Sequence, residues 1–292
     1  MPKFAILAES LHSTANGAIT YFKNEHGLKS IDLENPVKDF DKLGLRPSIQ
    51  GTSAGGSRYC IEVAERLRLP DSVLGFLAEC KKKNSPIKFI LVIPDGAEDG
   101  DPDYAKNLRA CKSNGIGVCT VDEDGSGTQH AGALSQLAVG VRHIEFSKYP
   151  IAFRSDLQMH METYLSGNPV KACQGVAEIL EDFTRKVVAK AHKEKLYPKV
   201  YKHSHSWADI CEEMQTKLVR EDPVTKKPTK CTPITKRLVS RIHGYTDYRN
   251  VVSHKPKNLE ELREREIKIR TYFEQFSDLL LELVNASKTL KP

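Results

Sequence analysis

Residues 245–254 read YTDYRNVVSH and lie at the end of a predicted helix. In this segment Arg249 precedes His254 by five positions. Two residues further on, Pro256 cannot continue a helix, and it disfavours a helical conformation for Lys255. The helix is therefore expected to end close to His254, which partly frees the histidine side chain from helical packing.

The stretches on both sides of this segment also carry helical patterns. The following helix has a clear start, because Asn258 is a suitable N-cap and Glu261 comes three residues later, close to the capping-box pattern. Three earlier apolar stripes, with a spacing of three and four, begin near Pro169, near Trp207 and after Thr232. Four amphipathic helices of this kind predict a helical bundle.

The sequence pattern differs before residue 150, where short β-rich runs alternate with helical patches and turn signals. The predicted elements are strands at 59–63, 89–94 and 116–121 and helices at 71–83 and 104–113. Strands separated by helices predict an α/β domain over residues 1–150, with a mixed sheet that includes parallel pairing and is flanked by helices. An all-α domain over residues 155–292 is expected to follow.

The composition is typical of a soluble protein of two domains, with 292 residues, 39% of them hydrophobic and 28% charged. No segment approaches the roughly 20 uninterrupted apolar residues of a membrane span, so a cytoplasmic protein without membrane association is expected. The seven cysteines form no CxxC pair, which favours reduced thiols over disulfides.

The positive charge lies in the second half of the chain. Residues 151–292 hold 26 Lys and Arg against 19 Asp and Glu, whereas residues 1–150 hold 18 against 19. This excess either attracts a polyanion such as nucleic acid or belongs to ordinary solvated helix faces.

An arginine and a histidine at one helix end suit a particular chemistry. A histidine can take the proton from a ribose 2′-hydroxyl near neutral pH, and an arginine can hold the scissile phosphate with two hydrogen bonds. On an ideal helix, Arg249 and His254 lie about 140° apart, so they would flank a ligand rather than contact each other. Such a reaction needs RNA but no metal. The alternative is that His254 only favours the negative end of the helix dipole.

The segment from Arg249 to His254 resembles the signature of the HEPN superfamily, in which a histidine follows an arginine after four to six residues. The resemblance implies a metal-independent ribonuclease without cofactors, typical of phage defence or toxin-like stress responses. It also implies a homodimer in which two copies of the motif face one cleft. Arg249 and His254 are then catalytic, with Asn250 as a supporting residue. The predicted RNA-binding side chains beside them are Arg241, Ser253, Lys255 and Lys257.

One position departs from the toxin branch of this superfamily. That branch often has a tyrosine two positions after the histidine, where this chain has Pro256. The departure disfavours the toxin subtype and not the superfamily.

A second resemblance concerns residues 40–125. The run from Leu45 to Ile49, a glycine-rich turn and the strand around Glu62 resemble the core of restriction-endonuclease-like PD-(D/E)xK domains. Those enzymes bind a divalent cation with two acids and use a lysine to assist the attacking water. Here Ser48 replaces the first acid and Ala64 replaces the lysine, so only Glu62 remains. The resemblance therefore implies an inactive domain with a sensing or regulatory role, open to a regulatory partner or a trigger.

The nuclease motif also occurs literally, as Pro70-Asp71 followed by Glu79-Cys80-Lys81. These residues fall on the predicted helix at 71–83, with the acid and the lysine on helical spacing. We therefore assign no metal site to them.

The sequence thus predicts an RNA endonuclease of the HEPN type. Two alternatives stay open: a non-catalytic adaptor that binds nucleic acid or protein, and a metal-dependent DNA nuclease that acts through the first domain.

Overall fold

The computed structural model describes residues 4–53, 56–142, 144–196, 206–217, 224–225 and 234–290, except for the side chains of residues 247–253 and 277. The chain divides into two compact units. The first comprises Met1–Gly140, Thr163–Pro169 and Lys255–Arg270, and the second comprises Val141–Glu162, Val170–His254 and Thr271–Pro292. Each unit therefore takes segments from distant parts of the chain, whereas the sequence predicts one boundary near residue 150.

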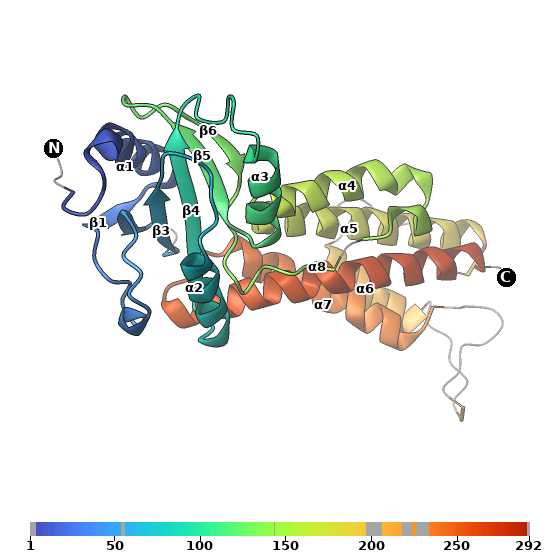
Figure 1. The fold of residues 1–292 in the computed structure, drawn as a ribbon. Helices are drawn as coiled ribbons and strands as arrows, with labels where there is room; N and C mark the ends of the chain where they lie inside the picture. The colour runs from blue at the N-terminus through green and yellow to red at the C-terminus, as the bar shows by residue number, and fades with distance from the viewer. Residues whose placement is uncertain are drawn as a thin grey trace. The chain divides into compact units, whose positions relative to one another are not determined.

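The first unit is built on a six-stranded mixed sheet whose strand order follows the sequence, from β1 to β6 (Figure 1). The strands are β1 (Lys29–Leu33), β2 (Ile49–Thr52), β3 (Arg58–Val63), β4 (Ile87–Pro94), β5 (Gly117–Val121) and β6 (Gly127–Ala131). β3, β4 and β5 run parallel to one another, and the other neighbouring pairs are antiparallel. The predicted mixed sheet with parallel pairing is thus confirmed.

Helices cover both faces of this sheet. Helix α1 (His12–His26) lies on one face, and α2 (Asp71–Lys82) and α3 (Tyr104–Ser113) lie on the other (Figure 1). Alternate residues of β4 enter the two cores, Ile90 on the α1 side and Phe89 on the opposite side. Because β4 is buried on both faces, its sequence is an almost unbroken apolar run rather than an alternating one.

The second unit is helical. It contains most of α4 (Ile151–Leu165) and α5 (Pro169–Lys193), all of α6 (Trp207–Lys217) and α7 (Lys236–Ser253), and the later part of α8 (Leu259–Lys288). The apolar stripes that predict these helices are buried, for example Val176 and Leu180 on α5 and Phe273 and Leu280 on α8. The helices predicted from Pro169, Trp207 and Asn258 are therefore confirmed.

Two features of the helical region differ from the sequence predictions. Helix α4 is absent from them, because its apolar side chains form no clean stripe: Ile151 is 81% exposed and Met159 is 53% exposed.

The third predicted helix begins at Lys236, because the Thr235 side chain is the N-cap and accepts a hydrogen bond from the Leu238 amide at 3.1 Å. The residues predicted to cap it, Thr232 and Pro233, lie outside the described residues.

The described cysteines are Cys60, Cys80, Cys111, Cys119, Cys173 and Cys211, and all of them are buried. None of the helices in the described ranges combines the length and the apolar composition needed to cross a membrane.

Substitution of Gly17 tests the packing of α1 on the sheet, and Gly75 on α2 provides the control. A Cβ atom at Gly17 would come within 1.9 Å of the backbone oxygen of Asp122, which follows β5, whereas one at Gly75 on α2 would meet nothing within 4 Å. We expect Gly17→Ala to lower the free energy of unfolding by about 1–3 kcal/mol, because the backbone must shift. Gly75→Ala should raise it by roughly 0.5–1 kcal/mol, because alanine favours a helix. Urea unfolding measures both, and equal effects would contradict the close approach of α1.

Candidate functional site

Helix α7 carries Arg249, the first residue of the arginine–histidine motif, and is anchored one turn before it. Tyr245 is 1% exposed, and its ring packs edge-on against Tyr272 of α8 with 5.4 Å between the centroids. Its hydroxyl donates a hydrogen bond to the backbone oxygen of Tyr272. Burial raises the pKa of Tyr245 well above its usual value, so the hydroxyl stays protonated and remains a donor. The backbone is therefore held in place four residues before Arg249.

The end of α7 separates the two motif residues. The helix ends at Ser253, and His254 is the first residue with an extended backbone, at φ −86° and ψ 136°. The His254 side chain is exposed. The helix end predicted from Pro256 is thus confirmed, with Arg249 inside the helix and His254 just beyond it.

The start of α8 is fixed by its cap. The side chain of Asn258 accepts a hydrogen bond from the Glu261 amide at 2.9 Å. The Glu261 carboxylate in turn accepts one from the Lys257 amide at 2.7 Å, one residue before the cap. This reciprocal arrangement confirms the N-terminus predicted from the capping-box pattern.

The structure describes the other predicted site residues to different degrees. Arg249, Asn250 and Ser253 lie in the last turns of α7, and their side chains lie outside the described residues. Lys255 and Lys257 follow the helix and are exposed. The roles of all five in binding RNA or in catalysis stay predictions.

Arg241 already has a protein partner. Its guanidinium forms an ion pair of 2.8 Å with Glu282 of α8, and the two side chains are 33% and 43% exposed. A partly exposed pair of this kind contributes about 0–1 kcal/mol. An RNA phosphate would therefore have to compete with Glu282 for Arg241, at a modest cost.

A second cluster lies in the first unit, where β2 begins and β3 ends. Ser48 directly precedes β2, and Glu62 is the penultimate residue of β3. The Ser48 amide donates a hydrogen bond to the Glu62 carboxylate at 3.1 Å, and the Ser48 hydroxyl oxygen accepts one from the Val63 amide at 3.1 Å. The fold thus brings together the two positions that the restriction-endonuclease resemblance assigns to metal-binding acids.

Glu34 joins this cluster and has no counterpart in the sequence predictions. Burial raises the pKa of Glu62, hydrogen bonds from Ser48 offset part of the effect, and the charge of Glu34 raises it further. Glu34 itself is 8% exposed, and its carboxylate accepts hydrogen bonds from the amides of residues 5–7. Burial raises the pKa of Glu34, but these three donors together with the charge of His12 outweigh it and lower the pKa below its ordinary value. The Glu34 carboxylate therefore binds the N-terminal backbone.

Neither the position of the nuclease lysine nor the literal motif forms part of a metal site in the described residues. Ala64 follows β3, and its amide donates a hydrogen bond to the Val92 oxygen at 2.9 Å. The literal motif lies on α2 as predicted, where Glu79 pairs with Lys82 at 3.3 Å. Within the part of the chain that the structure describes, no three or more His, Cys, Asp and Glu side chains are grouped so that they could hold a metal ion.

No protein-family model, no curated protein and no solved structure matches the chain. The HEPN and restriction-endonuclease resemblances therefore rest on the motif residues themselves.

The cluster at Glu34 gives a prediction about acid stability. We expect Glu34→Gln to lower the free energy of unfolding by about 1–2 kcal/mol near neutral pH, because charge-assisted hydrogen bonds to three amides are weakened. Since the folded-state pKa is lowered, the stabilising effect is present above the unfolded pKa of about 4.3 and is lost as the pH falls through the folded value. The difference between wild type and variant should therefore shrink in acid.

Urea unfolding over a range of pH measures this difference. Glu65→Gln is the matched control, because Glu65 is an exposed glutamate of the same unit. It should change the free energy of unfolding by less than about 0.5 kcal/mol. A Glu34→Gln effect that does not depend on pH would show that the charge of Glu34 is not what stabilises the cluster.

Proposed function

We propose that the protein is an RNA endonuclease that works without a metal, with Arg249 and His254 as its catalytic residues. The observation that supports this most is the end of α7, which leaves Arg249 in the helix and an exposed His254 immediately after it. A general base must be accessible to its substrate, and the exposed position of His254 meets this requirement.

The proposed reaction is a transesterification within RNA. His254 accepts the proton of a 2′-hydroxyl, and the 2′ oxygen forms a bond to the adjacent phosphorus while the bond to the 5′ oxygen breaks. The products are a 2′,3′-cyclic phosphate and, after protonation of the leaving oxygen, a 5′-hydroxyl. Arg249 stabilises the charge that builds on the phosphate oxygens, and Asn250 supports it. Lys255, Lys257, Ser253 and Arg241 are the proposed contacts to the RNA backbone.

We assign the helical region to the HEPN type and the α/β region to the restriction-endonuclease-like type. The first assignment is supported by the motif at the junction of α7 and α8, and the second by the contact between Ser48 and Glu62. Because Ser48 and Ala64 replace two of the three chemical groups of the nuclease motif, the α/β domain has a sensing or regulatory role in this proposal. The cytoplasm is the proposed location, and phage defence or a stress response is the proposed setting.

The proposal predicts which side chains RNA cleavage needs. Wild-type protein should cleave RNA and not DNA, with or without EDTA. Arg249→Ala and His254→Ala should each lower the rate by about 100-fold or more, because each removes a group that acts in the transition state. His254→Ala should keep the wild-type melting temperature, since that side chain is exposed.

Three variants serve as controls. His243→Ala and Arg237→Ala remove the same side-chain types from the same helix, α7, and Glu62→Gln removes the remaining acid of the nuclease motif. All three should cleave RNA at the wild-type rate. Wild-type rates in His254→Ala would contradict the proposal. DNA cleavage that both EDTA and Glu62→Gln abolish would instead indicate a metal-dependent DNA nuclease, and a lack of any cleavage would indicate an adaptor.

We further propose that the active unit is a homodimer formed through the helical region. One chain offers one base and one phosphate clamp, while the reaction also needs an acid for the leaving 5′ oxygen. A two-fold axis beside the ends of α7 would bring a second His254 to the same RNA.

Mixed dimers test this arrangement. When wild-type chains are mixed with His254→Ala chains under exchange, a shared site predicts that activity falls more steeply than the wild-type fraction. A strictly proportional fall, or a monomer in light scattering that still cleaves RNA, would contradict the shared site.

A further inference from the structure

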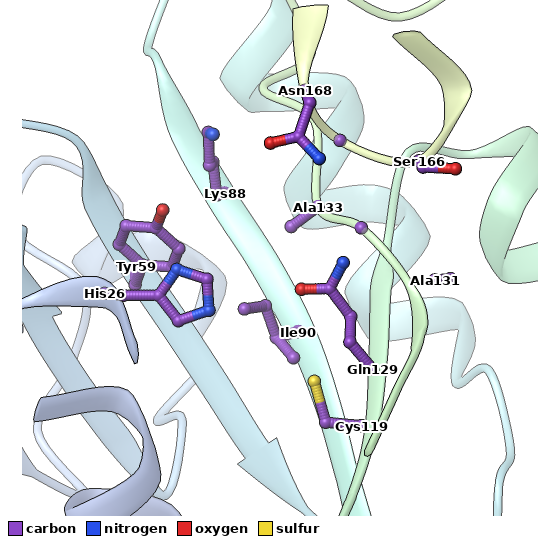
Figure 2. Close-up of a pocket in the computed structure, with 12 residues that line it drawn as sticks. His26, Tyr59, Lys88, Ile90, Cys119, Gln129, Ala131, Ala133, Ser166 and Asn168 are labelled. Atoms are coloured by element: carbon purple, nitrogen blue, oxygen red, sulfur yellow. The ribbon is translucent and has the colours of Figure 1, made fainter. Parts of the chain in front are cut away.

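A pocket of about 130 Å³ lies on the α1 side of the sheet, near the start of β3 and β4 (Figure 2). Its floor is apolar and consists of the buried side chains of Ile90 and Cys119. Its rim carries the exposed polar side chains of Gln129, Ser166 and Asn168. All its lining residues belong to the first unit. An apolar floor with polar groups at the rim is typical of sites that bind small ligands.

Two glycines bring a distant loop to this pocket. A Cβ atom at Gly132 would lie 1.7 Å from the backbone oxygen of Ser166, and one at Gly167 would lie 2.7 Å from the Cα of Gly132. Gly167 also has a φ of +87°, which favours glycine. Only residues without a side chain allow the two backbones to approach so closely, and this contact places Ser166 and Asn168 on the rim.

The polar side chains around the pocket can all donate a hydrogen bond, one of them is a cation, and none of the lining residues is acidic. The Lys88 ammonium lies over the Tyr59 ring, 5.8 Å from its centroid. The His26 ring lies 5.6 Å from the Tyr59 ring on the same side, whereas the Gln129 amide approaches from the opposite side (Figure 2). A site with one cation, several neutral donors and no carboxylate favours an anion.

The polar groups of the pocket are available to a ligand. Among the described residues, the side chains of Lys88, Gln129 and Asn168 make no hydrogen bond or ion pair with another residue. A neighbouring amide of similar type, on Gln136, does bond within the protein, to the Asn114 oxygen at 2.8 Å. Apart from the contact of Lys88 with the Tyr59 ring, these three side chains can therefore turn their polar groups to a ligand without breaking a hydrogen bond or an ion pair of the fold.

The size of the pocket limits the ligand. A cavity of roughly 150 Å³ takes up a molecule as large as benzene. A volume of about 130 Å³ therefore accommodates a tetrahedral oxyanion but not a whole nucleotide, whose sugar and base would extend past the rim.

We propose that this pocket is a binding site for a phosphoryl group, with Lys88 as its cation and Gln129 and Asn168 as hydrogen-bond donors. The phosphoryl group belongs either to free phosphate or to a phosphate ester such as a nucleotide. The site is independent of the proposed ribonuclease chemistry and lies on different elements of the chain.

His26 provides a local reporter for this binding. Burial lowers the pKa of His26, the charge of Lys88 lowers it further, and Glu25 opposes them. Tyr21 and Tyr59 also contact its ring. A bound anion stabilises the protonated imidazole, so it should raise the pKa of His26. Sulfate is the suitable probe for this measurement, because it does not titrate in the same pH range.

Calorimetric titrations test the site. They use the Arg249→Ala background, so that the proposed phosphate clamp of the nuclease site does not contribute. Inorganic phosphate, adenosine 5′-monophosphate and adenosine are the three probes. We expect saturable binding of the first two, with a dissociation constant on the order of 1 mM or below, and none of adenosine. Tighter binding of the nucleotide than of phosphate would identify an ester as the ligand, and equal binding would identify the free anion.

Two variants locate the binding. Lys88→Met and Gln129→Glu should each weaken it by about tenfold or more, the first by removing the cation and the second by adding a carboxylate of nearly the same shape. Lys112→Met changes the charge equally on α3, on the opposite face of the sheet, and should bind as wild type does. In NMR titrations, sulfate should raise the pKa of His26 in the parent and not in Gln129→Glu.

Two results would overturn the proposal. One is a lack of saturable binding of both phosphate and the nucleotide at about 10 mM. The other is binding that Gln129→Glu, shown to be folded by circular dichroism, retains within about twofold. Because Gln129 is exposed on the rim, this variant decides the question even if Lys88→Met does not fold.

Discussion

Pro256 is the constraint on which the proposed site depends. It lacks an amide hydrogen and restricts the residue before it, so α7 must end by this point of the chain. The observed end at Ser253 leaves His254 extended and exposed, and the Asn258 cap with Glu261 begins the next helix within a few residues. If residue 256 could continue the helix, His254 would be a helical side chain in the middle of one long helix. The break instead leaves it between two helices, with its side chain exposed.

The two ends of β3 have different surroundings: a cluster of carboxylates lies near one end and a pocket lies near the other. Near its end, Glu62 faces Ser48, and the neighbouring Glu34 binds backbone amides. Both carboxylates accept hydrogen bonds within the fold, and of the two only Glu62 stands at a position of the nuclease motif. Near its start, Tyr59 lines the pocket for which we propose phosphoryl binding. If both proposals hold, this domain keeps one of the two acids of the nuclease motif and binds a phosphoryl group on the other side, which would suit a sensing role.

The sequence predicts the elements whose burial produces a strong pattern. β4 is buried on both faces and reads as an apolar run, and α5 and α8 carry apolar stripes. β1 and β6 give no such signal, because β1 is at the edge of the sheet and most residues of both are exposed or partly exposed. The motif at the end of α7 could be recognised because its residues are close in sequence. The pocket could not, because His26, Lys88, Gln129 and Asn168 come from four distant segments that only the sheet topology and the approach of Gly132 to Gly167 bring together.

The most direct measurement concerns the nucleophile of the proposed reaction. An RNA that the protein cleaves is compared, in EDTA, with the same RNA carrying a single 2′-deoxy residue on the 5′ side of the cleaved bond. The account predicts that the first substrate yields a 2′,3′-cyclic phosphate and a 5′-hydroxyl, and that the second is not cut at that position. Cleavage at the deoxy position would contradict the account, because the 2′ oxygen from which His254 is proposed to take a proton is then absent.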